Sequence, residues 1–269
     1  MRDNPTDAFV LLEDFEKENR YSELTLTLDD WRSRPVPDRT FVLGHVFTTT
    51  SRAMLSADTG IGKTHLGFAL AFAMAAGESF CHWGGRDPCR VLIIDGEMSI
   101  DLVKERLADA ERRTGISPPG LFLVCREEAE DMPPLDSDEG QAWLDGLIQH
   151  LGGIDFLILD NAMSLTVADL KDEEAWRPVT AWMRLLTKRR CLWINHTGHD
   201  ATRSYGTKTR EWQLDTVMIA EAIEADPADI AMKIRFSKAR QRTPDTRDDF
   251  EPFALRLEGV EWTTSIVRN

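Results

Sequence analysis

Short apolar runs alternate with longer amphipathic segments through the middle of the chain. The runs are typical of buried strands, and the segments carry apolar residues at helical spacing. The expected strands are residues 53–57, 89–97, 121–125, 154–161 and 191–196, and the expected helices are residues 64–77, 99–115, 137–152 and 172–189. A strand that recurs after each helix predicts a βαβ series with right-handed crossovers, and therefore an α/β fold with a mostly parallel sheet.

The pattern changes at both ends of this series. After Asp215, residues 215–224, 229–239 and 250–262 read as consecutive strands joined by short turns. We expect them to extend the same sheet in antiparallel fashion, without forming a second domain. Residues 1–38 are polar and acidic, and we expect a separate N-terminal arm with one short helix, followed by a single domain of residues 39–269.

Composition narrows the possible environments and partners. The chain has 269 residues, 42% of them hydrophobic, and no apolar run approaches the roughly 18 residues that a membrane helix needs. Because the N-terminus also lacks a signal-peptide pattern, we expect a cytoplasmic protein with no membrane contact. The net charge of −14 repels nucleic acid overall, so any contact with DNA or RNA requires local basic loops, multiplied by oligomerisation.

The stretch "ADTGIGKTHL", residues 57–66, joins an expected strand to an expected helix. Glycines at positions 60 and 62 let backbone N–H groups approach a chain of phosphates, Lys63 supplies a cation, and Thr64 offers a hydroxyl to Mg²⁺. Ala57 stands where the usual pattern has glycine, which an ordinary extended backbone would tolerate. The expected nucleotide-binding residues are Asp58, Thr59, Gly60, Ile61, Gly62, Lys63, Thr64 and His65.

Two carboxylates are candidates for metal binding and catalysis. Asp160 ends the apolar strand "IDFLILD", and the carboxyl edge of a parallel strand places it beside the phosphate loop, where it would hold Mg²⁺ together with Thr64. Glu97 follows "VLIID" and can reach a water in line with the γ-phosphate, so we expect it to act as general base. Asp95 is the alternative base.

Polar residues follow the strand "CLWINH". Asn195 and His196 can hydrogen-bond a γ-phosphate and transmit its loss to the next loop, residues 197–210. The simpler interpretation of that loop is a solvated basic turn. A switch or DNA-binding role is favoured only if the loop lies beside a phosphate site. Its candidate residues are His199, Arg203, Lys208 and Arg210.

Lys238 and Arg240 lie two residues apart in "FSKARQR". The period of a strand sends both side chains to one face, from which they could stabilise transition-state charge at a neighbouring subunit's nucleotide. A solvated strand face is the alternative.

Together these motifs resemble the RecA-like ATPases, and within them the RepA/DnaB-like helicase branch, over roughly residues 40–262. "ADTGIGKT" resembles the Walker A element, "LIIDGE" the strand with the catalytic glutamate, and "FLILDN" Walker B. "NHTGHD" is similar to the histidine-bearing switch motif of plasmid RepA-type hexameric helicases. "SKAR" is similar to the K-x-R element that ring helicases insert into the adjacent site. Tyr205 stands where that family often has an arginine.

The resemblance implies a homo-oligomeric ring, a hexamer, with ATP and Mg²⁺ bound between subunits and single-stranded DNA in the pore. It also implies a replication-protein partner. Because the same core serves non-helicase ATPases, two hypotheses stay open. One is an ATP-driven helicase or translocase of a mobile element. The other is a nucleotide-gated assembly or regulatory ATPase that binds a protein partner.

Overall fold

The computed structural model describes residues 21, 24–35, 40–167, 190–197, 211, 213–224 and 230–267. The chain divides into two units, Met1–Asp38 and Arg39–Asn269. The described part of the first unit contains the helix α2 (Leu28–Ser33). Thr27 begins it with a capping box, since its hydroxyl accepts from the Asp30 backbone while the Asp30 carboxylate accepts from the Thr27 backbone.

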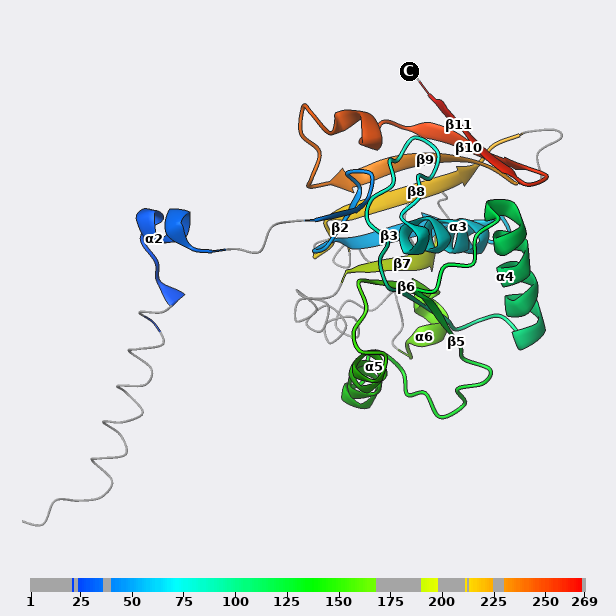
Figure 1. Ribbon diagram of the computed structural model, residues 1–269, viewed down its shortest axis with the longest axis horizontal. Helices are drawn as coiled ribbons and strands as arrows, with labels where there is room; N and C mark the ends of the chain where they lie inside the picture. Colours follow the sequence, from blue (N-terminus) through cyan, green and yellow to red (C-terminus); the bar gives the residue numbers. More distant parts are fainter. Residues whose placement is uncertain are drawn as a thin grey trace, which may run out of the picture. The chain divides into compact units, whose positions relative to one another are not determined.

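A nine-stranded sheet forms the centre of the second unit (Figure 1). Its strands lie in the order β11-β10-β9-β8-β3-β7-β6-β4-β5. The six from β8 to β5 are parallel, and β9, β10 and β11 continue the sheet in antiparallel fashion. The parallel strands are β3 (Arg52–Ala57), β4 (Val91–Asp95), β5 (Leu121–Cys125), β6 (Phe156–Asp160), β7 (Cys191–His196) and β8 (Thr216–Ala222). This confirms the predicted mostly parallel sheet with a C-terminal antiparallel extension.

The C-terminal extension differs in detail from the prediction. The strand β9 (Ile230–Ala239) matches the expected run. The expected strand of residues 250–262 is divided: Phe250 ends a short 3-10 helix, η2 (Arg247–Phe250), and a hairpin follows. The hairpin consists of β10 (Phe253–Glu258) and β11 (Glu261–Ile266), which turn at Gly259 with φ of 57°. A separate two-stranded sheet, β1 (Phe41–Leu43) with β2 (Phe47–Thr48), was not predicted.

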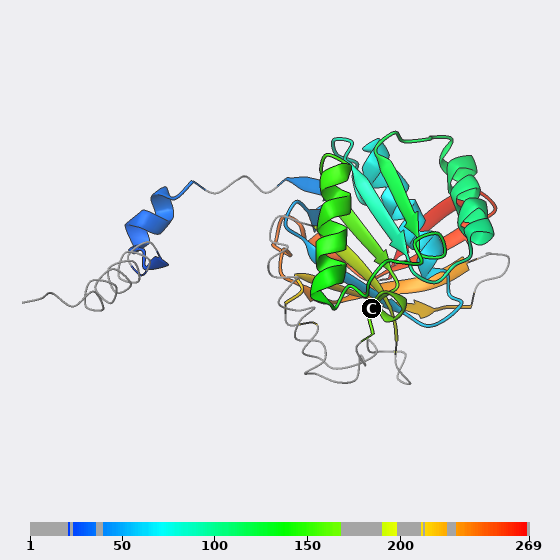
Figure 2. The ribbon, with the colours of Figure 1, turned by 90° about the horizontal axis from the view of Figure 1, so that it is seen from below.

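Helices pack on both faces of the sheet (Figures 1 and 2). Two of them begin at serine caps: Ser99 accepts from the Leu102 backbone and Ser137 from the Gly140 backbone. Within the described residues of the second unit, the α-helices are α3 (Lys63–Ala76), α4 (Ile100–Thr114), α5 (Asp138–His150) and α6 (Ala162–Leu165). The helix expected over residues 172–189 lies outside the described residues.

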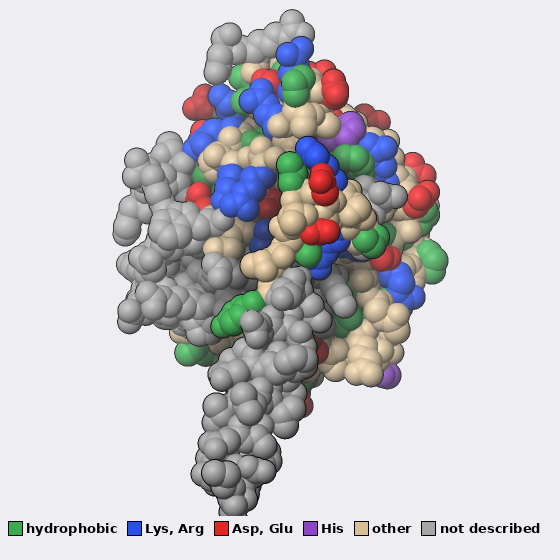
Figure 3. All heavy atoms as spheres, turned by 90° about the vertical axis from the view of Figure 1, so that its left-hand side faces the viewer, with side chains coloured by type: hydrophobic (Ala, Val, Ile, Leu, Met, Phe, Trp, Pro, Cys, Tyr) green, Lys and Arg blue, Asp and Glu red, His purple; other side chains and the backbone are tan. Residues whose placement is uncertain are grey.

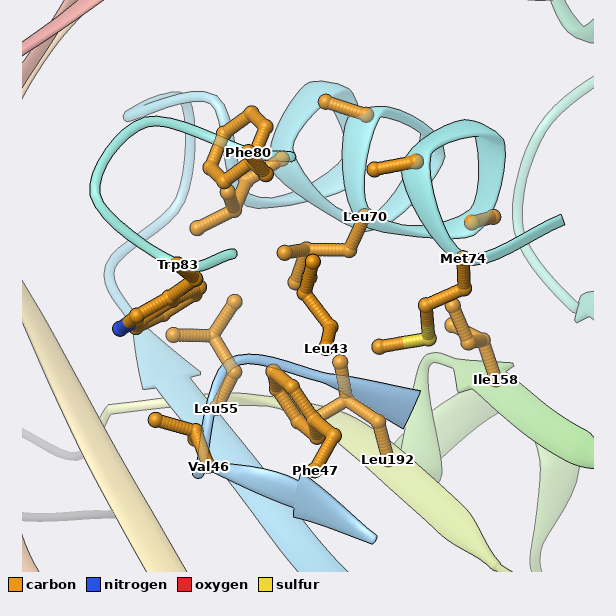
Figure 4. Close-up of a cluster of buried hydrophobic side chains, with 14 of the residues drawn as sticks. Leu43, Val46, Phe47, Leu55, Leu70, Met74, Phe80, Trp83, Ile158 and Leu192 are labelled. Carbon is orange, nitrogen blue, oxygen red and sulfur yellow. The ribbon is translucent and has the colours of Figure 1, made fainter. Parts of the chain in front are cut away.

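The sheet has a hydrophobic core on each face, because successive side chains along a strand point to opposite faces. One core packs α3 against one face of the sheet and includes Leu55, Leu70, Ile158 and Leu192, with Trp83 beside them (Figure 4). The other packs α5 and α6 against the opposite face. The helix α3 packs closely on β7: a Cβ at Gly67 would come within 2.6 Å of Ile194 Cδ1, so a larger residue there would require the end of that side chain to move.

The carboxyl ends of four parallel strands bring the candidate site together. Ala57 ends β3 opposite His196, which ends β7. Asp95 ends β4 opposite Asp160, which ends β6. Because these strands run in one direction, residues far apart in sequence meet at one edge of the sheet.

Candidate nucleotide-binding site

The loop between β3 and α3 has the backbone that phosphate binding requires. Gly60 and Gly62 have φ of 81° and 95°, the left-handed region that glycine adopts without steric cost. Gly62 begins α3 with no side-chain cap, so the first N–H groups of the helix are free of a capping side chain and available to an anion. Ala57 continues β3 in regular pairing and has no positive φ, which explains why alanine is tolerated there.

Lys63 lies at the start of α3, 7% exposed. Its Nζ donates to the Asp58 carbonyl at 3.4 Å. Burial lowers the pKa of this ammonium, while the charges of Asp160, Glu97 and Asp58 oppose the change. The lysine is therefore a largely buried cation whose charge is favoured by nearby carboxylates. A chain of phosphates would be a suitable counter-ion for it.

Asp160 is 4% exposed and accepts a hydrogen bond from Thr64. Burial raises the pKa of Asp160 to about 7, with the charge of Asp95 adding to the increase and Thr64 and Lys63 opposing it. Asp160 and Thr64 present hard oxygen donors at one point, which fits Mg²⁺. Among the described residues no group of three or more His, Cys, Asp or Glu could hold a metal, so these two would bind the ion together with water and phosphate oxygens.

Asp95 hydrogen-bonds the backbone of the turn that carries Glu97, and its side chain lies on the same face of the sheet as that of Asp160. Its Oδ1 accepts the backbone N–H groups of Glu97 at 3.2 Å and Met98 at 2.7 Å. Asp95 is 1% exposed, and burial raises its pKa. Glu97 is exposed. The buried Asp95 thus shapes the turn after β4, and the exposed Glu97 is the carboxylate that can meet a water molecule.

His196 and Asn161 link Glu97 to the phosphate loop. His196 Nδ1 lies 3.3 Å from Thr59 Oγ1, and its Nε2 lies 3.3 Å from Asn161 Nδ2. Asn161 Nδ2 also donates to Glu97 Oε2. Burial, helped by the charge of Lys63, lowers the pKa of His196, so the imidazole is neutral at physiological pH.

Several predicted residues lie apart from this group. Asn195 is fully buried, and the alternation of β7 turns it to the face of Trp193, away from His196. The prediction that Asn195 meets the γ-phosphate beside His196 is therefore not supported by its position. His65, in the first turn of α3, directs Nδ1 toward Asp109 of α4 at 3.9 Å.

Lys238 and Arg240 lie at the opposite edge of the sheet. Arg240 Nη1 is 3.4 Å from Asp215 Oδ1, just before β8, and Lys238 Nζ donates to the Glu211 carbonyl. The antiparallel β9 begins at the phosphate loop, where Ile230 packs over Gly62. Lys238 is eight residues further along, about 27 Å away at the usual rise of a strand. Because β9 ends at Ala239, only Lys238 lies within the strand, which corrects the prediction that both do.

The predicted switch residues His199, Arg203, Lys208 and Arg210 lie outside the described residues. In the part of the chain that is described, no helix is long and apolar enough to span a membrane.

Sequence reasoning did not find Asn161 and gave Asp95 only as an alternative base. Asn161 directly follows Asp160 in "FLILDN", which is the one signal that could have pointed to it. Its partners Glu97 and His196 are 64 and 35 residues away, so no local spacing predicts their contact.

Comparisons with known proteins agree with this geometry. The sequence profile of the AAA_25 family, described as an AAA domain, matches residues 17–202. No curated protein matches the chain in sequence. Among solved structures, the KaiC-like protein PH0186 from the hyperthermophilic archaeon Pyrococcus horikoshii OT3 superposes with a TM-score of 0.54 at 11% identity, covering 86% of this chain and 100% of that one. That likeness shows the fold. With the phosphate loop at the edge of a RecA-like sheet, the family match identifies the chain as a member of the AAA domain family AAA_25.

Proposed function

We propose that this chain hydrolyses ATP in a homo-oligomer. One observation carries the proposal: the loop of residues 58–63, the Thr64–Asp160 pair and Glu97 all lie at one edge of the sheet. The loop N–H groups and Lys63 would bind the phosphates. Mg²⁺, held by Thr64 and Asp160, would neutralise charge on the phosphate oxygens. Glu97 would orient the attacking water and accept its proton.

The buried Asp160 predicts how the nucleotide-free protein responds to pH. Its folded pKa of about 7 lies above the ordinary aspartate value of 3.8, so between these values the folded state holds a proton that the unfolded chain releases. The contribution of Asp160 to the free energy of unfolding therefore falls as pH rises from about 4 to 7.

Urea unfolding without Mg²⁺ at pH 5 and pH 8 measures this contribution. We expect Asp160→Asn to flatten the decrease and to be more stable than the parent at pH 8, whereas Asp248→Asn, at an exposed side chain, keeps the parental slope. Saturating Mg–ATP should restore stability to the parent and not to Asp160→Asn. Equal slopes in the parent and Asp160→Asn would contradict the buried-carboxyl interpretation.

Substitutions of Lys63 and Glu97 should affect different steps, the first ATP binding and the second ATP hydrolysis. Lys63→Ala removes the cation that faces the phosphates, and we expect ATP binding to be lost in a fluorescent-nucleotide titration. Glu97→Gln keeps the shape of the side chain but not its basicity, so ATP affinity should persist while kcat falls roughly 10²- to 10⁴-fold. Normal hydrolysis by Glu97→Gln would exclude Glu97 as the base.

The position of Lys238 and Arg240 supports a site shared between subunits. Both lie about a strand's length from their own phosphate loop, so they cannot reach the nucleotide that this loop binds. A neighbouring subunit in a closed ring could present them to that nucleotide, where a cation stabilises transition-state charge.

Mixing two inactive variants tests the shared site. Arg240→Ala protomers keep Glu97, and Glu97→Gln protomers keep Arg240, so mixed oligomers should recover part of the parental turnover in a coupled ATPase assay. Arg242→Ala, which removes an exposed arginine paired with Glu251, is the matched control and should be active alone. Absence of recovery at every mixing ratio would count against a trans role for Arg240.

For the use of this energy we propose movement along single-stranded DNA. The chain would act as a helicase or translocase that forms a RepA-like hexameric ring and has a replication-protein partner. The supporting observations are the basic residues of the loop 197–210 and the K-x-R pair. The alternative, a regulatory ATPase that assembles on ATP and binds a protein, is favoured by the net charge of −14. Figure 3 shows basic and acidic side chains mixed on the described part of one face.

Steady-state ATP hydrolysis at low salt, with and without single-stranded DNA, distinguishes these two functions. The motor predicts stimulation of several-fold or more, which should weaken as salt rises because phosphate contacts release counter-ions. Lys63→Ala is the blank. Binding of ATP with slow turnover that DNA does not change would favour the regulatory ATPase.

A further inference from the structure

Asn161 has a side chain whose two ends face different parts of the molecule. Its Oδ1 accepts three hydrogen bonds at the start of α6, from the Met163 and Ser164 N–H groups at 3.0 and 3.1 Å and from the Ser164 hydroxyl at 3.0 Å. These donors fix the orientation of the amide, because the Nδ2 end could not replace Oδ1 as their acceptor. Nδ2 must therefore face Glu97 and His196, as the structure has it.

The α6 turn that holds Asn161 is itself anchored. Arg126, after β5, donates to the Ser164 carbonyl, and the Leu165 N–H donates to the Asn161 carbonyl at 3.2 Å. Asn161 is 2% exposed, so water does not compete for its amide. The amide is consequently a rigid donor, whereas Glu97 is an exposed side chain that would otherwise sample several rotamers.

The same amide determines which nitrogen of His196 carries the proton. Because Nδ2 donates to Nε2 at 3.3 Å, Nε2 must be the unprotonated nitrogen, and Nδ1–H is left to donate to Thr59 Oγ1 at 3.3 Å. A continuous chain of hydrogen bonds then runs from the phosphate loop through His196 and Asn161 to Glu97.

We infer that Asn161 is a positioning residue that holds the Glu97 carboxylate and links it to the phosphate loop through His196. The donor to Oε2 leaves Oε1 free to accept from the attacking water. This inference rests on the proposed ATPase function for its catalytic consequence, but the hydrogen-bond chain can be measured without turnover.

Two substitutions distinguish the role of Asn161 as a donor to Glu97 from its role as the N-cap of α6. Asn161→Ser keeps a side-chain acceptor for the α6 N–H groups but lacks a donor that reaches Glu97, and Asn161→Ala loses both. If Asn161 positions Glu97, kcat should fall about 10-fold or more in both variants while the KM for ATP changes less than about 2-fold, since misplacing a catalytic group costs turnover. Only Asn161→Ala should also lose thermal stability.

A second arm tests whether the effect passes through Glu97. On the Glu97→Gln background, Asn161→Ser should cause no further loss of residual turnover, because the two changes affect one interaction. Parental kcat in Asn161→Ser, with loss confined to Asn161→Ala, would reduce Asn161 to a helix cap and overturn the inference.

Imidazole ¹⁵N spectroscopy of the nucleotide-free protein at pH 8 measures the chain directly. His196, one of six histidines, is assigned from the signal lost in His196→Gln. We expect the Nδ1–H tautomer in the parent, and an increased population of the Nε2–H tautomer in Asn161→Ser. An Nε2–H tautomer in the parent would overturn the inference. If the parent shows the Nδ1–H tautomer but no turnover under any condition, the ATPase proposal fails and the hydrogen-bond chain stands.

Discussion

The structure depends on keeping charged groups out of water at one edge of a parallel sheet. Asp95 and Asp160 end neighbouring strands opposite each other, 1% and 4% exposed, with the buried cation Lys63 close enough to affect Asp160. Burial of like charges raises the pKa of both carboxyls, so the arrangement is unfavourable unless a counter-ion arrives. A metal ion with a phosphate chain would relieve it.

The fold accounts for how such a site can be maintained. Each strand that carries a charged end is apolar along its length and buried on both faces, by α3 on one side and by α5 and α6 on the other. The side chains of Leu55, Leu70, Ile158 and Leu192 form a continuous core between α3 and the sheet (Figure 4). The free energy gained from this packing offsets the unfavourable burial of charge at the site, so the domain stays folded.

The nine-stranded sheet also separates two kinds of cation. Lys63 lies at the edge where the parallel strands end, and Lys238 and Arg240 lie at the edge where they begin. An antiparallel strand, β9, connects the two edges, since Ile230 covers Gly62 and Lys238 follows eight residues later. In the proposed ring, protomers that meet edge to edge would bring these two groups of cations to one nucleotide.

The sequence by itself determined the elements and the chemistry that depends on adjacent residues. Apolar runs and apolar residues at helical spacing predicted the strands and helices, because local propensity and burial agree in them. Gly60, Gly62, Lys63 and Thr64 identify a phosphate loop, since its backbone and side chains act within one turn of chain.

Tertiary structure alone decided the rest. Pairing of β4 with β6 and of β3 with β7 set which face each strand end presents, turning His196 toward the loop and Asn195 away. It also brought Asn161 to Glu97, because contacts between residues 64 positions apart follow from sheet order and not from spacing.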